Sequence, residues 1–171
     1  MNTMHTQRGF TLIELLLYVS ISALLLLAIS VFLSTLVESR IKNQIIAEVD
    51  QQGVQVMQQI TQALRNADAV NSPTLGTSAG ALSLNSIIAG NNPTIFDLAS
   101  GVIRITEGAG AAVPLTNARI TISALQFTNL SRANTPDTIQ ITFTVSAVNP
   151  SGRSEYSYQQ TFTGSATLRQ P

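Results

Sequence analysis

A long, uninterrupted run of apolar positions stands near the start of the chain. Residues 10–37 contain no Pro or Gly, and Glu14 is the only charged residue among them. A helix over this range is about 42 Å long, whereas the hydrocarbon core of a bilayer is about 30 Å thick. The run is also longer than the apolar region of an ordinary secretory signal, which has about 7–15 residues. The pattern therefore predicts a membrane-spanning helix over residues 10–37.

From residue 38 the pattern becomes that of an amphipathic helix. Gly53 interrupts it at a cost of about 1 kcal/mol relative to Ala, so it either permits close packing or bends the helix. The helix is expected to end near residues 66–68, before the turn signal "NSP". We therefore predict that residues 38–68 continue the same rod and pack on the C-terminal domain rather than in a coiled coil. The apolar stripe consists of Ile41, Ile45, Val49, Val56, Ile60 and Leu64.

Residues 69–171 change to strand-like patterns separated by turn residues. "TIQITFTV" alternates apolar and polar positions, as a strand with one buried face does. The turn sequence "NPSG" separates the last two runs, which predicts a C-terminal hairpin. The sequence thus predicts an α+β fold, with a long N-terminal helix packed on a C-terminal antiparallel β-sheet. The expected strands are 81–88, 94–98, 102–106, 118–123, 125–129, 138–148 and 154–167.

Composition removes several classes of chemistry. Nine basic and nine acidic residues give zero formal charge, and no basic cluster stands out, so we expect no nucleic-acid partner. Cysteine is absent, which excludes disulfides, thiolate catalysis and cysteine-based zinc sites. The single histidine, His5, precedes the apolar run. We therefore expect no enzyme, no catalytic residue and no cofactor.

The loops carry no recognisable ligand motif. "GAGAAVP", at residues 108–114, lacks the Gly-Lys-Ser/Thr ending of a phosphate-binding loop and is expected to be a loop tip. Asp97 and Glu107 could meet in space, but acidic residues beyond residue 70 are too sparse for a typical calcium site, so no metal site is predicted. Tyr156 and Tyr158 are expected to pack against a neighbouring strand.

The start of the apolar run resembles a known processing signal. "GFTLIEL" begins at Gly9, directly after Arg8, and resembles the prepilin signal of the type IV pilin superfamily. The resemblance implies that a prepilin peptidase cuts between Gly9 and Phe10 and then N-methylates Phe10. Residues 1–9 would be the leader, with Arg8 as its basic residue. The close match extends to about residue 37, and the remainder resembles the family in architecture alone.

Glu14 has two interpretations. The resemblance implies that its carboxylate pairs with the Phe10 amine of a neighbouring subunit in a filament, where two charges that are costly alone offset each other. From the residues themselves, Glu14 can instead lie near the positive end of its own helix dipole. Both interpretations can hold, the second in the membrane and the first after assembly.

The resemblance implies a structural subunit, a minor pilin or pseudopilin of a type IV pilus, competence or type II secretion filament. Val31 stands where many major pilins have Pro, and the paired C-terminal cysteines of many major pilins are lacking, which favours a minor, J-type subunit. Its partners would be the prepilin peptidase, other pilins through the N-terminal helix, an inner-membrane assembly platform and, before assembly, membrane lipid.

The same resemblance implies a single-pass inner-membrane protein with its globular domain outside the cytoplasm. After assembly, the protein would be part of a surface or periplasmic filament. The basic residues Arg8, Arg40 and Lys42 flank both ends of the apolar run, so the distribution of charge does not decide the membrane topology.

Two alternative functions from other classes stay open. One is a membrane-anchored surface protein with an extracellular β-rich binding domain, and the other is a membrane-tethered enzyme.

Overall fold

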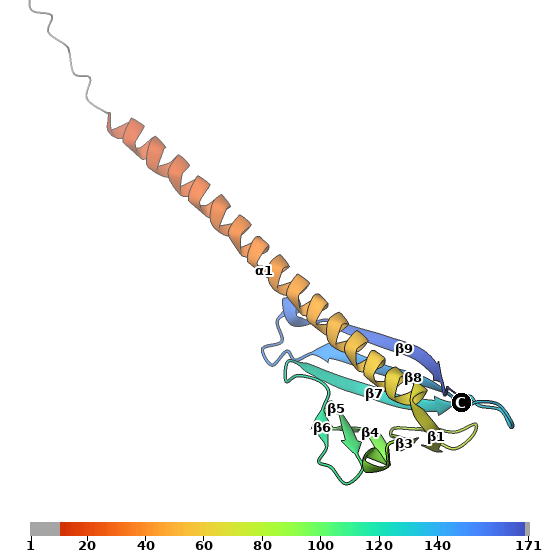
Figure 1. The fold of residues 1–171 in the computed structure, drawn as a ribbon. Coiled ribbons are helices and arrows are strands. Elements are labelled where there is room, and N and C mark those ends of the chain that lie inside the picture. The colour runs from red at the N-terminus through yellow and green to blue at the C-terminus, as the bar shows by residue number, and fades with distance from the viewer. Residues whose placement is uncertain (1–10, 170–171) are drawn as a thin grey trace, which may run out of the picture. The chain divides into compact units, whose positions relative to one another are not determined.

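The computed structural model describes residues 11–169 and shows one long helix followed by short strands (Figure 1). Helix α1 spans Leu12–Arg65. Two 3₁₀ turns, η1 (Ala89–Asn91) and η2 (Ser154–Tyr156), interrupt the β-rich part. The strands are β1 (Ala67–Ser72), β2 (Ser78–Ala79), β3 (Leu82–Ser86), β4 (Thr94–Ala99), β5 (Val102–Glu107), β6 (Val113–Pro114), β7 (Ile120–Asn129), β8 (Thr138–Ala147) and β9 (Gln159–Thr167).

The chain divides into two compact units, Met1–Ile41 and Lys42–Pro171. In the first unit, the described residues are the N-terminal part of α1 and the residue before it. The second unit contains the remainder of α1 and all the strands, so it has its own hydrophobic core. The α+β layout of a long helix with a C-terminal antiparallel sheet region is thus confirmed.

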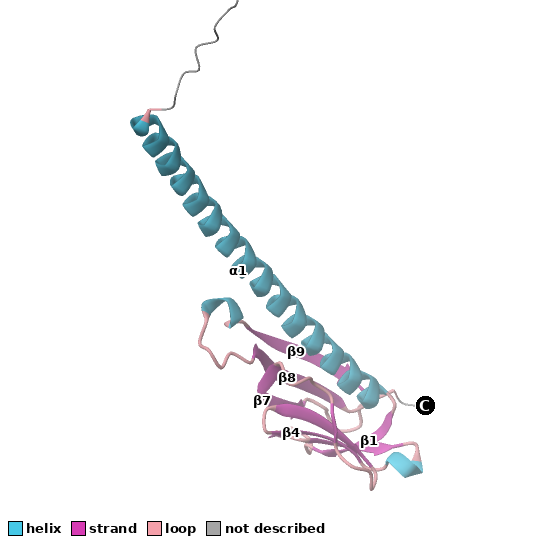
Figure 2. Ribbon diagram, turned by 90° about the vertical axis from the view of Figure 1, so that its left-hand side faces the viewer, coloured by secondary structure: helices cyan, strands magenta, loops and turns pink. Residues whose placement is uncertain are grey.

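The strands of the second unit form two antiparallel sheets rather than the single sheet expected from the sequence (Figure 2). One has the order β1-β3-β4-β5-β6 and the other the order β2-β7-β8-β9. The longest pairings join β7 to β8 and β8 to β9, and the latter pair is the predicted C-terminal hairpin. Alternation of apolar and polar positions identifies strands but not their partners, which is why the division into two sheets was missed.

The amphipathic part of α1 buries the predicted face. Ile45 packs at the edge of this core, while Ile41 lies outside the core cluster. Opposite the helix, β7 and β8 contribute a row of inward-facing residues that includes Phe127, Ile141 and Phe143. Residues spaced three or four apart lie on one side of a helix, so the sequence spacing selects the buried face. The buried residues of α1 are Val49, Gly53, Val56, Ile60 and Leu64.

Gly53 permits close packing, the first of the two roles suggested by the sequence. A Cβ atom placed on Gly53 would overlap the ring of Phe162 on β9. Phe162 in turn stacks on Phe143 of β8, with 5.6 Å between the ring centroids. The absence of a side chain at Gly53 therefore lets an aromatic ring lie directly against the helix backbone, and α1 continues through this position without a break.

Three local expectations were wrong. The first strand was expected at residue 81, but Ala67–Ser72 already forms β1 through pairing with β3, despite few β-favouring residues. The expected strands 118–123 and 125–129 are one strand, β7, with a bulge between Ser123 and Gln126 and a positive φ at Ala124. The "GAGAAVP" segment is mostly loop, as expected, but its end forms the short strand β6.

The last strand begins later than expected. Residues 154–156 form η2, and β9 starts at Gln159, so Tyr156 and Tyr158 do not lie on a strand. The side chain of Asn149 explains the difference, because its Oδ1 accepts from the Arg153 backbone N–H (3.1 Å) and its Nδ2 donates to the Arg153 carbonyl (2.8 Å). Such local side-chain bonds compete with strand pairing. The Arg153 guanidinium also lies over the Tyr156 ring.

Candidate functional site

The described chain begins at a capped helix end. The Thr11 carbonyl accepts from the Leu15 N–H at 3.1 Å, and the Thr11 hydroxyl oxygen accepts from the Glu14 N–H at 3.4 Å. Thr-x-x-Glu is the pattern of a capping box, in which the first residue satisfies an unpaired helix N–H. Thr11 is not among the residues predicted from the sequence, although this four-residue pattern could have identified it.

Glu14 lies in the first turn of α1 and is exposed. A carboxylate there interacts favourably with the positive end of the helix dipole, by about 0.3–1 kcal/mol at exposed sites. This placement matches the second interpretation of Glu14. The first interpretation is an ion pair with the Phe10 amine. It stays a prediction, because Phe10 lies outside the described residues.

The N-terminal part of α1 presents a continuous apolar surface. All residues from 11 to 40 are exposed, and large apolar side chains surround the helix on every side. The most apolar window of α1 has a mean hydropathy of 2.6, so the helix is long and apolar enough to cross a membrane. Such a surface is costly in water, and lipid or other apolar helices must cover it.

The hydroxyl groups of Ser20 and Thr35 bond to the helix itself. Ser20 Oγ donates to the Leu17 carbonyl at 2.9 Å, and Thr35 Oγ1 lies within 3.0 Å of the Val31 and Phe32 carbonyl oxygens. These bonds satisfy side-chain donors without a partner from outside the helix. The segment can therefore enter an apolar medium without exposing these unpaired polar groups.

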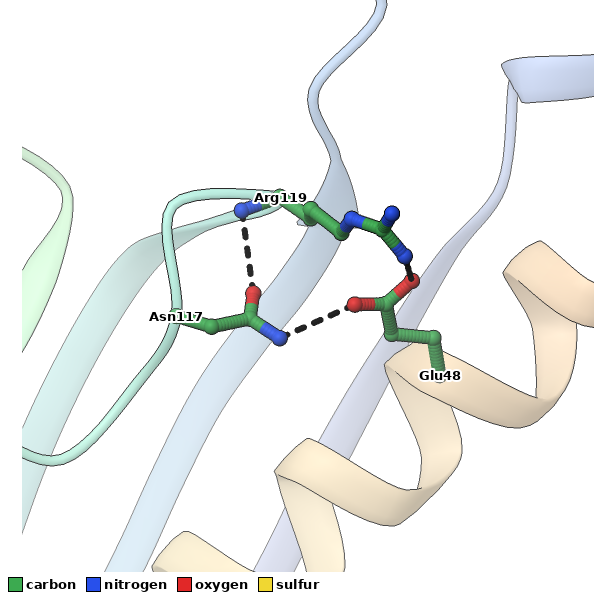
Figure 3. A network of polar contacts seen from close by, with 3 residues as sticks. All are labelled: Glu48, Asn117 and Arg119. Atoms are coloured by element: carbon green, nitrogen blue, oxygen red, sulfur yellow. Dashed lines mark hydrogen bonds and ion pairs between the residues drawn. The ribbon is translucent and has the colours of Figure 1, made fainter.

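In the second unit, a polar network fixes the β6–β7 loop to α1 (Figure 3). The Asn117 side chain donates to Glu48 Oε1 at 2.9 Å, and its Oδ1 accepts from the Arg119 backbone N–H at 2.9 Å. The Arg119 guanidinium lies 3.4 Å from Glu48 Oε2. Since Arg119 is largely exposed, this ion pair contributes little to stability, and the network mainly positions the loop.

Two further polar contacts connect different elements of the second unit. The Tyr158 hydroxyl donates to Asp50 Oδ1 of α1 at 3.4 Å, and burial, followed by the nearby Asp50 charge, raises the pKa of Tyr158. On the other sheet, Arg104 donates two hydrogen bonds to Asp97, at 2.9 and 2.6 Å, and these bonds raise the pKa of Arg104. Both contacts hold elements together rather than forming a reactive site.

Asp97 and Glu107, the carboxylates considered for calcium, are not brought together. Asp97 pairs with Arg104 across β4 and β5, whereas Glu107 lies opposite Thr94 and accepts from the Asn91 side chain at 3.1 Å. Within residues 11–169, no group of three or more His, Cys, Asp or Glu residues is placed to hold a metal ion.

Three residues of the predicted processing site, Arg8, Gly9 and Phe10, lie outside the described residues. Glu14 is therefore the one predicted site residue whose surroundings the structure gives. The exposed apolar surface that follows it is the candidate functional site, because a helix of this kind must be inserted in lipid or covered by similar helices.

Comparison with protein families identifies a known motif near the start of the chain. A family model described as the prokaryotic N-terminal methylation motif matches residues 4–30, a range that includes Gly9, Phe10 and Glu14. The comparisons with curated proteins and with solved structures found no match. A prepilin motif on an apolar helix indicates a membrane-anchored protein with a globular domain, processed by a prepilin peptidase. The chain thus carries a type IV pilin-like prepilin signal ahead of an α+β layout of the pilin kind.

Proposed function

We propose that this protein is a minor pilin or pseudopilin, a structural subunit that enters a type IV pilus, competence or type II secretion filament through its N-terminal helix. The methylation motif at residues 4–30, which overlaps the start of an exposed apolar helix, is the observation that carries the proposal. The folded second unit would then be presented outside the membrane by this helix.

The processing steps follow from the same signal. Cleavage between Gly9 and Phe10 removes residues 1–9, with Arg8 as the basic residue of the leader, and the new Phe10 amine is N-methylated. The transmembrane part then extends over residues 10–37, the amphipathic part over 38–68 and the β-rich part over 69–171. Thr11 supports this division, because it caps α1 immediately after the proposed cleavage point.

Assembly would require Glu14. A carboxylate at the centre of a spanning helix costs about 2.5–3.5 kcal/mol for insertion, and less near a helix end. Before assembly, the dipole of α1 lowers the free-energy cost of the Glu14 carboxylate, and the Thr11 cap satisfies a backbone N–H at the same helix end. In a filament, the Phe10 amine of a neighbouring subunit offers a partner of opposite charge, and one carboxylate per subunit matches one amine per subunit.

The subunit is proposed to be minor rather than major. Helix α1 runs through Val31 without a break, whereas Pro at this place would remove a helical hydrogen bond. The same proposal includes an orientation in the inner membrane with the second unit outside the cytoplasm. It also includes recruitment of the subunit by an inner-membrane assembly platform.

The test compares Glu14→Gln with Glu14→Ala. Losing one partner of a buried ion pair typically costs about 3–5 kcal/mol, which is a reduction in recruitment of about a hundredfold or more. Both variants should remain in the membrane fraction, yet neither should co-purify with cross-linked partner pilins. Glu38→Gln is the matched control, since it removes a carboxylate beyond the apolar run and should assemble normally.

Other outcomes would contradict the proposal. If Glu14→Gln assembles like the wild type, a charge pair is not the mechanism. If both variants leave the membrane, Glu14 serves insertion instead of assembly. A wild-type protein that stays in the membrane without any pilin partner would favour the membrane-anchored surface protein.

A further inference from the structure

A small crevice lies where the C-terminal end of α1 meets the loop that carries η1. Its volume is about 180 Å³. Pockets for drug-sized ligands are larger, with about 300–1,000 Å³. The crevice therefore suits a single long side chain better than a free organic ligand. Its lining includes Ala63, Leu84, Ile87, Ile88, Asn91 and Glu107.

The rim of the crevice exposes two consecutive isoleucines. Ile87 is 74% exposed and Ile88 is 64% exposed, although both are large aliphatic side chains. Single exposed apolar residues are common on protein surfaces, but a neighbouring pair at the rim of a crevice makes a local apolar patch. Covering this patch would remove apolar surface from water, which is the main driving force for association.

Local hydrogen bonds hold the loop in place. The Ile88 N–H donates to Ser86 Oγ at 3.3 Å, and the Ile88 carbonyl accepts from the Asn91 N–H at 2.9 Å. The Asn91 carbonyl accepts from Thr94 Oγ1 at 2.8 Å. Because the loop is fixed before a partner arrives, binding would cost less ordering entropy.

The charge of the crevice is negative. Glu107 is its one charged lining residue, and its Oε1 accepts from the Asn91 side chain at 3.1 Å. The C-terminal end of α1 adds the negative end of a helix dipole. Arg65, in the last turn of the helix, is exposed and lies outside the lining. The lining combines aliphatic side chains with polar ones and a single carboxylate, which matches a cation carried on an apolar stem.

We propose that this crevice docks a partner protein chain through an arginine flanked by aliphatic residues. The guanidinium would pair with Glu107 near the end of α1, and the stem would lie along the aliphatic side chains of the lining, as long basic side chains commonly do. Arginine fits better than lysine because its planar group is more weakly hydrated and binds a carboxylate with two hydrogen bonds. The proposal does not depend on filament assembly or on the proposed function.

The test titrates a defined peptide pair into the full-length protein in detergent micelles. One blocked pentapeptide carries arginine between two leucines, and the other carries citrulline, which has a similar shape but no charge. Two-dimensional ¹⁵N NMR should show saturable shifts of Ile87, Ile88 and Asn91 with the arginine peptide. The citrulline peptide should bind at least threefold more weakly, because it lacks the charge that pairs with Glu107.

Variants assign the effect to the crevice. Glu107→Gln keeps an acceptor for Asn91 but removes the charge, so it should abolish the difference between the two peptides. Ile88→Ser should weaken both peptides at least threefold, whereas Val113→Ser, at another exposed apolar residue, should change neither. Spectra that match the wild type away from the substitution will show that each variant is folded.

Four results would overturn the proposal. The first is equal binding of the two peptides by the wild type, and the second is a difference that persists in Glu107→Gln. The third is the same set of shifts produced by raising the detergent concentration alone, which would identify a lipid-like occupant. Shifts that stay absent up to millimolar peptide would also overturn it.

Discussion

At the scale of single residues, Gly53 is the position where helix propensity and packing make opposite demands. Glycine in a helix interior costs about 1 kcal/mol relative to alanine. Yet the Phe162 ring occupies the space that a side chain at Gly53 would need. The packing of β9 on α1 thus depends on the residue that weakens the helix.

We predict that Gly53→Ala destabilises the protein in spite of its better helix propensity. Overpacking a core typically costs about 1–3 kcal/mol, and the ring of Phe162 must move or α1 must shift away from β9. Urea unfolding of the full chain in detergent, followed by tyrosine fluorescence, measures the change. Gln55→Ala, at an exposed position of the same helix, should be neutral or stabilising. A Gly53→Ala protein more stable than the wild type would refute this packing role.

At the scale of elements, the periodicity of α1 explains which of its faces is buried. Val54 and Val56 are chemically identical and two residues apart, but Val54 is 47% exposed and Val56 is 0% exposed. Two residues correspond to about 200° around a helix, so the two side chains lie on nearly opposite sides. This pair therefore separates the effect of burial from the effect of residue type.

We predict that Val56→Asp prevents stable folding of the second unit and that Val54→Asp does not. An unpaired charge in the core costs several kcal/mol, a large share of the total stability of a typical domain, about 5–15 kcal/mol. Val54→Asp should change the unfolding free energy by about 0.5 kcal/mol or less. Amide NMR spectra and thermal unfolding would measure both. Equal stability of the two variants would contradict the observed orientation of α1.

The elements also show what the sequence could predict. The turn signal "NSP" placed the end of α1 within a few residues, and strict alternation located β8 to within one residue at its end. The strand β1 and the late start of β9 were not predictable in this way. The first depends on pairing with β3, and the second on the Asn149 side chain, so neither leaves a periodic signal.

The candidate site was predictable to a different extent. The apolar run and the Gly9–Phe10 junction are local signals, so sequence alone can indicate them, and the motif match at residues 4–30 includes the junction. Cleavage at this junction stays a prediction. The capping role of Thr11 was available from the Thr-x-x-Glu spacing but was overlooked. The crevice beside Ile87 and Ile88 could not be predicted, because it forms only when the end of α1 meets residues that lie far apart in the sequence, among them Leu84 and Glu107.

At the scale of the whole molecule, the second unit has the contents of an independent domain. It contains the complete hydrophobic core, including the buried residues of α1. The exposed apolar part of the helix belongs to the first unit and contributes nothing to this core. Removing it should therefore improve solubility without removing buried contacts.

We predict that a chain beginning at residue 38 folds by itself in water. About 130 residues are enough to bury a single core. The expected result is a single cooperative thermal transition and a well-dispersed NMR spectrum. A truncated chain that aggregates, or that melts without cooperativity, would mean that the N-terminal part of α1 is needed for folding.

The central claim, that the chain is processed as a prepilin, is tested most directly by mass spectrometry of its N-terminus. The protein would be purified from cells with an active prepilin peptidase, together with a variant in which a bulky residue replaces Gly9. The account predicts a wild-type chain that begins at N-methylated Phe10 and a variant that still carries Met1. A wild-type chain that retains Met1 in these cells would contradict the account.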